Sequence, residues 1–160
     1  MIVVADSGPL HYLILLDHSE LLRRFYSRVV VPDAVASELS AAGAPPTVRD
    51  WILQPPSWVS VVPVAPEAVE TITDDLDFGE RSAIALAATL GADLLLIDEA
   101  AGRAEARRRS LRVTGTPGVL RVGAEQGLVN VPALIGPLKT TSFYVDDALV
   151  NAVFQRWLRP

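Results

Sequence analysis

Two apolar runs of strand length each end at an acidic residue, and this repeated pattern constrains the fold more than any other feature of the sequence. Residues 2–5 (Ile-Val-Val-Ala) precede Asp6, and residues 94–97 (Leu-Leu-Leu-Ile) precede Asp98. Uninterrupted apolar runs of this length are typical of strands buried on both faces in a parallel sheet. Because ligands gather at the carboxyl ends of such strands, we expect Asp6 and Asp98 to lie near each other at that edge.

Segments with helical spacing alternate with the strand-like runs. Residues 28–31, 58–62 and 112–114 are the other strand candidates. Helices are predicted over residues 10–16, 19–26, 32–40, 48–53, 81–90, 100–109, 119–126, 131–138 and 146–158. Strands joined by crossover helices favour a three-layer α/β/α fold with a central, mostly parallel sheet. The sequence has no repeat, low-complexity tract or linker, so we expect a single domain spanning residues 1–160.

Composition excludes several classes of protein. The chain has no cysteine, which rules out a disulfide framework, a thiolate zinc site and a cysteine nucleophile. Its longest apolar runs are far shorter than the ~20 residues of a membrane span, and its first residues do not resemble a signal peptide. We therefore expect a soluble cytoplasmic protein that does not enter the membrane.

The charge distribution matters more than the net charge of −5, which by itself does not favour general binding of polyanions. Thirteen of the fourteen basic residues are Arg, and five of these fall between Arg103 and Arg112. A local basic patch on an acidic protein is consistent with this distribution.

Two more acids are candidates to join Asp6 and Asp98. Glu38 lies on the predicted helix 32–40. Glu80 lies in the first turn of another predicted helix, directly before residues 81–90. Each acid alone also has a structural interpretation, because Asp6 can cap a helix and Glu80 favours a helix dipole. Two carboxylates ~4 Å apart, however, repel by about 4 kcal/mol at an effective dielectric near 20. A converged cluster therefore needs salt bridges, a shared proton or a divalent cation.

The chemistry that such a cluster supports is hydrolysis of a phosphodiester. Oxygen ligands without His or Cys suit Mg²⁺ or Mn²⁺ and disfavour zinc. A cation held by carboxylates can activate water and neutralise charge on a phosphate, so no side-chain nucleophile is needed. The sequence offers no Gly-x-Ser-x-Gly elbow, and we interpret His11 and His18 as ordinary helix residues.

Two other phosphate-handling classes fit poorly. A phosphate-accepting receiver domain needs a Lys after a late strand, but the sole Lys, Lys139, falls in a helical stretch. A haloacid-dehalogenase-like phosphatase needs an Asp two residues after Asp6, and position 8 is Gly.

Five segments, in the right order and with the right gaps, match a known family over most of the chain. They are residues 3–10, 31–39, 76–87, 94–99 with Arg103 and Ala106 beyond, and 114–120. With these segments the sequence resembles the PIN-domain superfamily, and more closely its predicted nucleic-acid-binding branch related to VapC-type toxins.

The resemblance implies a site and an activity. Asp6, Glu38, Glu80 and Asp98 would be the catalytic, metal-binding acids, with Glu99 at a supporting metal-binding position. Family members are typically Mg²⁺- or Mn²⁺-dependent ribonucleases, often homodimers, and often paired with an antitoxin that blocks the site. One departure is Thr116, which stands where many PIN nucleases carry another acid. A hydroxyl can hold a water but adds no charge, which predicts a weaker site or a single ion.

Substrate contacts are predicted for Ser7, Arg81, Arg103 and Thr116. Arg103 follows Glu99 by four residues, so it is either part of a solvated Glu–Arg ladder or a contact to the scissile phosphate. Arg107 and Arg108 would then guide the RNA strand.

A second hypothesis is a PIN-like module that binds RNA or a protein and cuts poorly. The net charge and Thr116 favour it, and the Pro-rich segment 44–56 is its candidate partner groove. Tyr12, Trp51 and Trp58 could stack on bases, but we interpret them as packed side chains.

Overall fold

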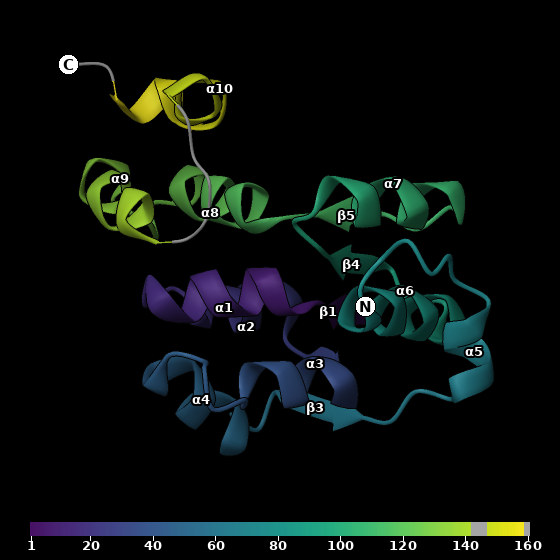
Figure 1. The fold of residues 1–160 in the computed structure, drawn as a ribbon. Helices are drawn as coiled ribbons and strands as arrows, with labels where there is room; N and C mark the ends of the chain where they lie inside the picture. The colour runs from purple at the N-terminus through teal and green to yellow at the C-terminus, as the bar shows by residue number, and fades with distance from the viewer. Residues whose placement is uncertain (142–146, 159–160) are drawn as a thin grey trace.

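One parallel sheet forms the centre of the protein. The computed structural model describes residues 1–141 and 147–158. Its strands are β1 (Val3–Ala5), β2 (Val29–Pro32), β3 (Val59–Val62), β4 (Leu94–Leu96) and β5 (Val113–Thr114). They are ordered β3-β2-β1-β4-β5, and every neighbouring pair is parallel (Figure 1). The predicted central sheet is therefore confirmed.

Helices connect the strands and complete the chain. They are α1 (Ser7–Leu15), α2 (Glu20–Tyr26), α3 (Asp33–Leu39), α4 (Pro46–Leu53), α5 (Pro66–Glu70), α6 (Phe78–Leu90), α7 (Ala100–Arg108), α8 (Thr116–Glu125), α9 (Val131–Thr140) and α10 (Asp147–Leu158). Each predicted helix is present with its ends shifted by a few residues; residue 146, where the last was expected to begin, lies outside the described residues. Helix α5 was not predicted, although Pro66 in its first turn is a recognised start signal. Within the described ranges, no helix combines the length and the apolar character needed to cross a membrane.

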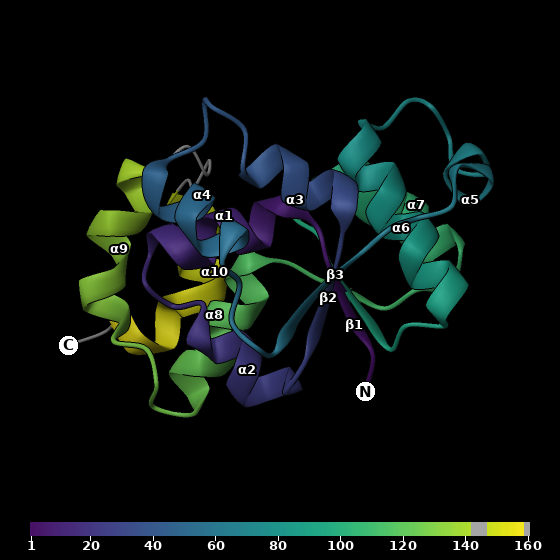
Figure 2. The same ribbon diagram turned by 90° about the horizontal axis from the view of Figure 1, so that it is seen from below.

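The helices cover both faces of the sheet and bury two separate cores. Val3 and Ala5 contribute to a core formed with α1, α2, α3, α4, α8, α9 and α10. Val4, between them, points to the opposite core, which is formed with α5, α6 and α7. This alternation follows from the two-residue period of a strand. Figure 2, viewed along the sheet, shows the two helical layers on either side of the strands and confirms the three-layer α/β/α fold.

The order of the strands creates a crevice beside β1. The chain runs from β1 outward to β2 and β3, and then returns to place β4 on the other side of β1. Helix α1, which follows β1, packs in the first core, whereas α7, which follows β4, packs in the second. The two helices therefore diverge from adjacent strand ends, and such a switch point is where open α/β sheets bind ligands.

Candidate functional site

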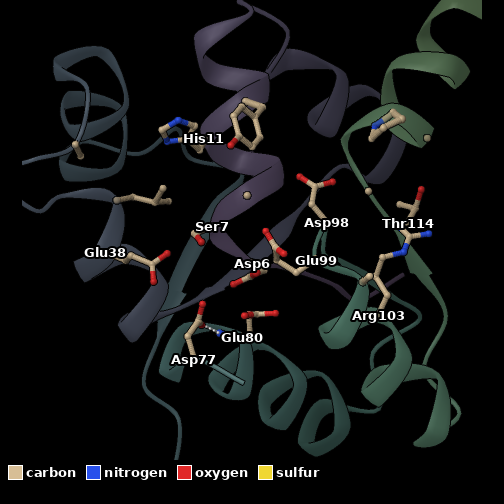
Figure 3. Close-up of a pocket in the computed structure, with 18 of the residues that line it drawn as sticks. Asp6, Ser7, His11, Glu38, Asp77, Glu80, Asp98, Glu99, Arg103 and Thr114 are labelled. Carbon is tan, nitrogen blue, oxygen red and sulfur yellow. Dashed lines mark hydrogen bonds between the residues drawn. The ribbon is translucent and has the colours of Figure 1, made fainter. Parts of the chain in front are cut away.

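A pocket of about 1080 Å³ opens at this switch point (Figure 3). Among the described residues, its acidic lining consists of Asp6, Glu38, Asp77, Glu80, Asp98 and Glu99. The structure therefore brings together all five acids that the sequence predicted as metal-binding residues, and it adds Asp77. The carboxylates come from the ends of β1 and β4, from α3 and from the start of α6.

Asp6 is the most deeply placed of these acids. Its backbone N–H donates to the Leu96 carbonyl at 2.9 Å, which ties the end of β1 to β4. Its side chain is 3 % exposed, and Oδ1 has no hydrogen-bond partner. Burial raises the pKa of Asp6 to about 7. A hydrogen bond from the Ser7 backbone lowers this pKa, and repulsion from the neighbouring acids raises it further. A bound cation or a proton would therefore stabilise this buried carboxylate.

Glu80 repeats this condition from the other side of the pocket. It lies in the first turn of α6, is 8 % exposed, and its Oε2 has no hydrogen-bond partner. Burial raises its pKa, and a hydrogen bond to Asp77 adds to the shift. Helix α7 passes so close that a Cβ on Gly102 would lie 2.6 Å from Oε2. A side chain at position 102 would require Glu80 or its neighbour Ile97 to shift.

Asp98 is held by hydrogen bonds instead. Thr116 donates to its carboxylate from both the backbone and the hydroxyl. Burial raises the pKa of Asp98, while these hydrogen bonds and the charge of Arg103 act in the opposite direction. Thr116 itself is completely buried and is not part of the pocket lining, so the structure does not bring this predicted substrate contact to the pocket surface.

The remaining acids are exposed to solvent at the pocket. Glu38 and Glu99 were predicted, whereas Asp77 was missed. Asp77 is the N-cap of α6, and its carboxylate accepts a hydrogen bond from the Glu80 backbone at 2.8 Å. An Asp three residues before Glu80 is a recognisable capping signal, and it could have located this residue from the sequence.

Two arginines line the pocket and two predicted ones do not. Arg103 lies at the pocket and donates to the Ile97 carbonyl at 3.3 Å; within the described ranges it makes no ion pair with Glu99, so the expected ladder does not form there. Arg107, one turn later, is exposed and also lines the pocket. Arg108 instead pairs with Glu105, and Arg81 reaches the Val69 carbonyl at 3.5 Å outside the pocket.

Ser7 lines the pocket as predicted, and His11 and Tyr12 line it as well. The two rings are in edge contact, with centroids 4.8 Å apart and planes at 76°. Burial lowers the pKa of His11. His11 is a helix residue and Tyr12 packs against it, as interpreted from the sequence, and both half-buried side chains also line the pocket, which was not predicted.

Trp51 and Trp58 are packed against each other, as predicted. Their ring centroids lie 5.9 Å apart in an edge-to-face arrangement, and Trp58 is buried in the first core. Neither indole lines the pocket that holds the acids.

The donor set fits a hard divalent cation. Two buried carboxylate oxygens lack partners, and several like charges face one another across the pocket. Oxygen ligands of this kind suit Mg²⁺ or Mn²⁺. In the part of the chain that the structure describes, however, no three His, Cys, Asp or Glu side chains are grouped closely enough to hold a metal ion. The pocket therefore presents carboxylates from several elements without arranging them as a closed cage.

The family model DUF3368, described as a PIN domain, matches residues 2–159. No curated protein matches the chain significantly.

Proposed function

Because the chain belongs to the PIN-domain family, we propose that it is an endoribonuclease that depends on Mg²⁺ or Mn²⁺ and cuts RNA at the carboxylate pocket. PIN domains are generally metal-dependent nucleases. The observation that carries the proposal is the pair of buried, unpartnered oxygens in the pocket, Asp6 Oδ1 after β1 and Glu80 Oε2 in the first turn of α6.

We assign the metal to the pocket acids. Asp6, Glu38, Glu80 and Asp98 would hold the ion, with Glu99 in support. When bound, the cation supplies Lewis acidity, which lowers the pKa of water and offsets charge on the phosphate. The chain's own residues position the acids. Thr116 fixes the Asp98 carboxylate, and Gly8 and Gly115 leave room for it, because a Cβ on either would lie within 3.0 Å of one of its oxygens.

Binding of the RNA phosphate requires positive charge, and two arginines supply it at this otherwise acidic pocket. Arg103 and Arg107 line it from one side of α7. The first turns of α1, α7 and α8 also contribute residues to the lining, and helix N-termini attract anions. We assign phosphate contacts to Arg103 and Arg107, with Ser7 at the start of α1 as a further contact.

The biological setting that we propose follows from the resemblance to VapC-type toxins. The protein would be the toxin of a toxin–antitoxin pair, would act in the cytoplasm as a homodimer, and would be blocked by an antitoxin protein that covers the pocket. Growth arrest on expression of the wild type, but not of Asp98→Asn, and relief by a co-expressed partner would support this setting.

A second candidate function is an RNA- or protein-binding module with little activity. It is favoured by the absence of a three-ligand group among the described residues and by Thr116 at a position where many PIN nucleases carry an acid. RNA binding that does not require a metal ion and is not followed by cleavage would support this binding module.

The test is a cleavage assay with matched variants. Purified protein is incubated with single-stranded and structured RNA in Mg²⁺, in Mn²⁺ and with chelator, beside Asp6→Asn, Asp98→Asn and Glu67→Gln. Glu67 is an exposed acid on α5 outside the pocket, so it controls for loss of charge alone. We expect metal-dependent cleavage that is lost in both Asn variants and kept in Glu67→Gln. An inert wild type that still binds RNA would instead establish the binding module.

A further inference from the structure

The carboxylate pocket continues along α1 to a pair of aromatic rings. Ser7 and His11 are four residues apart on this helix, as are Gly8 and Tyr12, and all four residues line the pocket. Residues four apart lie on the same helical face, one turn from each other. In Figure 3, His11 lies beyond Ser7 as seen from Asp77 and Glu80. The rings therefore stand about one helical turn beyond Ser7 and Gly8, within the same cavity as the acids.

The two rings meet at nearly a right angle. With planes at 76° and centroids 4.8 Å apart, they form a corner in which one ring can lie parallel to a flat ligand while the other faces its edge. Both side chains are partly exposed at the pocket. The apolar residues Leu39, Pro45 and Pro117 also line the pocket. A flat, partly apolar ring with polar edges fits this corner.

We propose that His11 and Tyr12 form a nucleobase subsite, which takes up an unpaired base of the RNA strand whose phosphate lies at the carboxylates and Arg103. In a nucleotide the sugar links the phosphate to the base. The pocket likewise has a phosphate-binding part, at the carboxylates and Arg103, and an aromatic part, at His11 and Tyr12. Aromatic side chains bind every base through its π-face, so the subsite favours single-stranded RNA over a particular sequence. A base within a duplex is stacked and paired, and cannot enter the corner without leaving the helix.

This subsite rests on the proposed function, because an RNA strand must lie in the pocket. It is tested by binding in the presence of chelator, so that no cleavage occurs. The probe is a short fluorescein-labelled single-stranded RNA, together with a series of the same RNA that carries one abasic ribose at each position in turn. Affinity is measured by fluorescence anisotropy for the wild type, His11→Ala, Tyr12→Ala, His11→Phe, Tyr12→Phe and His18→Ala.

We expect an abasic ribose at one position to weaken binding to the wild type roughly tenfold, in line with the stacking contribution of one base. His11→Ala and Tyr12→Ala should weaken binding of the intact RNA by a similar factor and should show no further loss with that abasic probe. The Phe variants retain a ring and should bind close to the wild type. His18 lies beyond α1 and outside the pocket lining, so His18→Ala should change nothing.

Two outcomes overturn the subsite, and they are distinguishable from failure of the proposed function. A wild type that binds and cuts RNA but is insensitive to every abasic substitution has no base subsite. The same conclusion follows if folded His11→Ala and Tyr12→Ala bind as the wild type does. A wild type that neither binds nor cuts any RNA removes the proposed nuclease, and the subsite with it.

Discussion

Thr116 donates two hydrogen bonds to the carboxylate of Asp98, one from its backbone N–H to Oδ1 and one from its hydroxyl to Oδ2, each 2.7 Å long. Thr116 begins α8 directly after β5, and Asp98 follows β4, so the contact joins two neighbouring strand ends. Both oxygens of Asp98 are thereby fixed in orientation. The hydroxyl is committed to this acid and not to the open pocket, which makes Thr116 a positioning residue in our account.

Removal of the hydroxyl should weaken the site without unfolding the protein. In Thr116→Val the Oδ2 hydrogen bond is lost while the backbone bond to Oδ1 remains. Loss of a group that orients a metal ligand typically costs 10- to 100-fold in metal affinity or activity, and we expect a loss in this range. Thr116→Ser keeps the hydroxyl and should stay close to the wild type. Equal loss in Ser and Val, measured by single-turnover cleavage and Mn²⁺ titration, would contradict a positioning role.

The raised pKa of Asp6 should make the metal-free protein less stable as pH rises. Burial in the fold raises the pKa of this carboxyl from its ordinary value of 3.8 to about 7. Between these values the native state holds more protons than the unfolded state, so the free energy of unfolding falls as pH increases from about 4 to 7 and then levels off. At about 1.4 kcal/mol per pKa unit, the cost above pH 7 is on the order of 4 kcal/mol.

Asp6→Asn removes this cost because the amide stays neutral. We expect the variant to be more stable than the wild type at pH 8 by up to that amount, and to show little advantage at pH 4. Urea denaturation of metal-free protein across this range measures the difference. Glu67→Gln should show no such trend, and a pH-independent difference for Asp6→Asn would contradict the assigned cause.

Arg107 and Arg108 provide a matched pair for RNA binding. Arg107 is exposed at the pocket, whereas Arg108 is held by Glu105 on the same helix. Arg107→Ala should lower RNA affinity and reduce the salt dependence of binding by about 0.7 in the slope of log K against log salt, as for one phosphate contact on a single strand. Arg108→Ala should leave both unchanged. Equal effects would show that α7 contributes only general positive charge.

Gly102 should resist substitution because α7 passes close to the acids. A Cβ there would lie 2.6 Å from both Glu80 Oε2 and Ile97 Cδ1. Gly102→Ala should displace Glu80 and reduce cleavage, and a shift in the Mn²⁺ affinity should accompany the loss. Gly136 on α9 has nothing within 4 Å of its added Cβ, so Gly136→Ala is the control and should retain activity. Wild-type activity and metal affinity in Gly102→Ala would contradict the close approach.

The sequence predicts the parts of the site that depend on local pattern. Asp6 and Asp98 follow apolar runs that are buried on both faces, and their juxtaposition follows from the parallel sheet. Glu38 and Glu80 were candidates from their places on predicted helices, and their metal-binding role was implied by the resemblance to a family. Asp77 was missed although its capping position is a local signal.

Other features depend on tertiary contacts that no local pattern encodes. His11 reaches the pocket because α1 buries Leu10, Leu13 and Ile14 in the first core, which leaves His11 at the crevice. Arg81 lies next to Glu80, yet it points to Val69, because adjacent residues on a helix face different directions. The partner of Thr116 follows from the pairing of β4 with β5; residues 112–114 were predicted as a strand, but their neighbour in the sheet was not.

Direct measurement of Mn²⁺ binding tests the central claim, that the carboxylate pocket is a divalent metal site. Electron paramagnetic resonance counts bound Mn²⁺ at pH 8 on the wild type, on Asp6→Asn combined with Asp98→Asn, and on Glu67→Gln, each with and without single-stranded RNA. We expect binding by the wild type and by Glu67→Gln and none by the double variant. A folded wild type that binds RNA but holds no Mn²⁺ in either condition would contradict the metal-dependent nuclease.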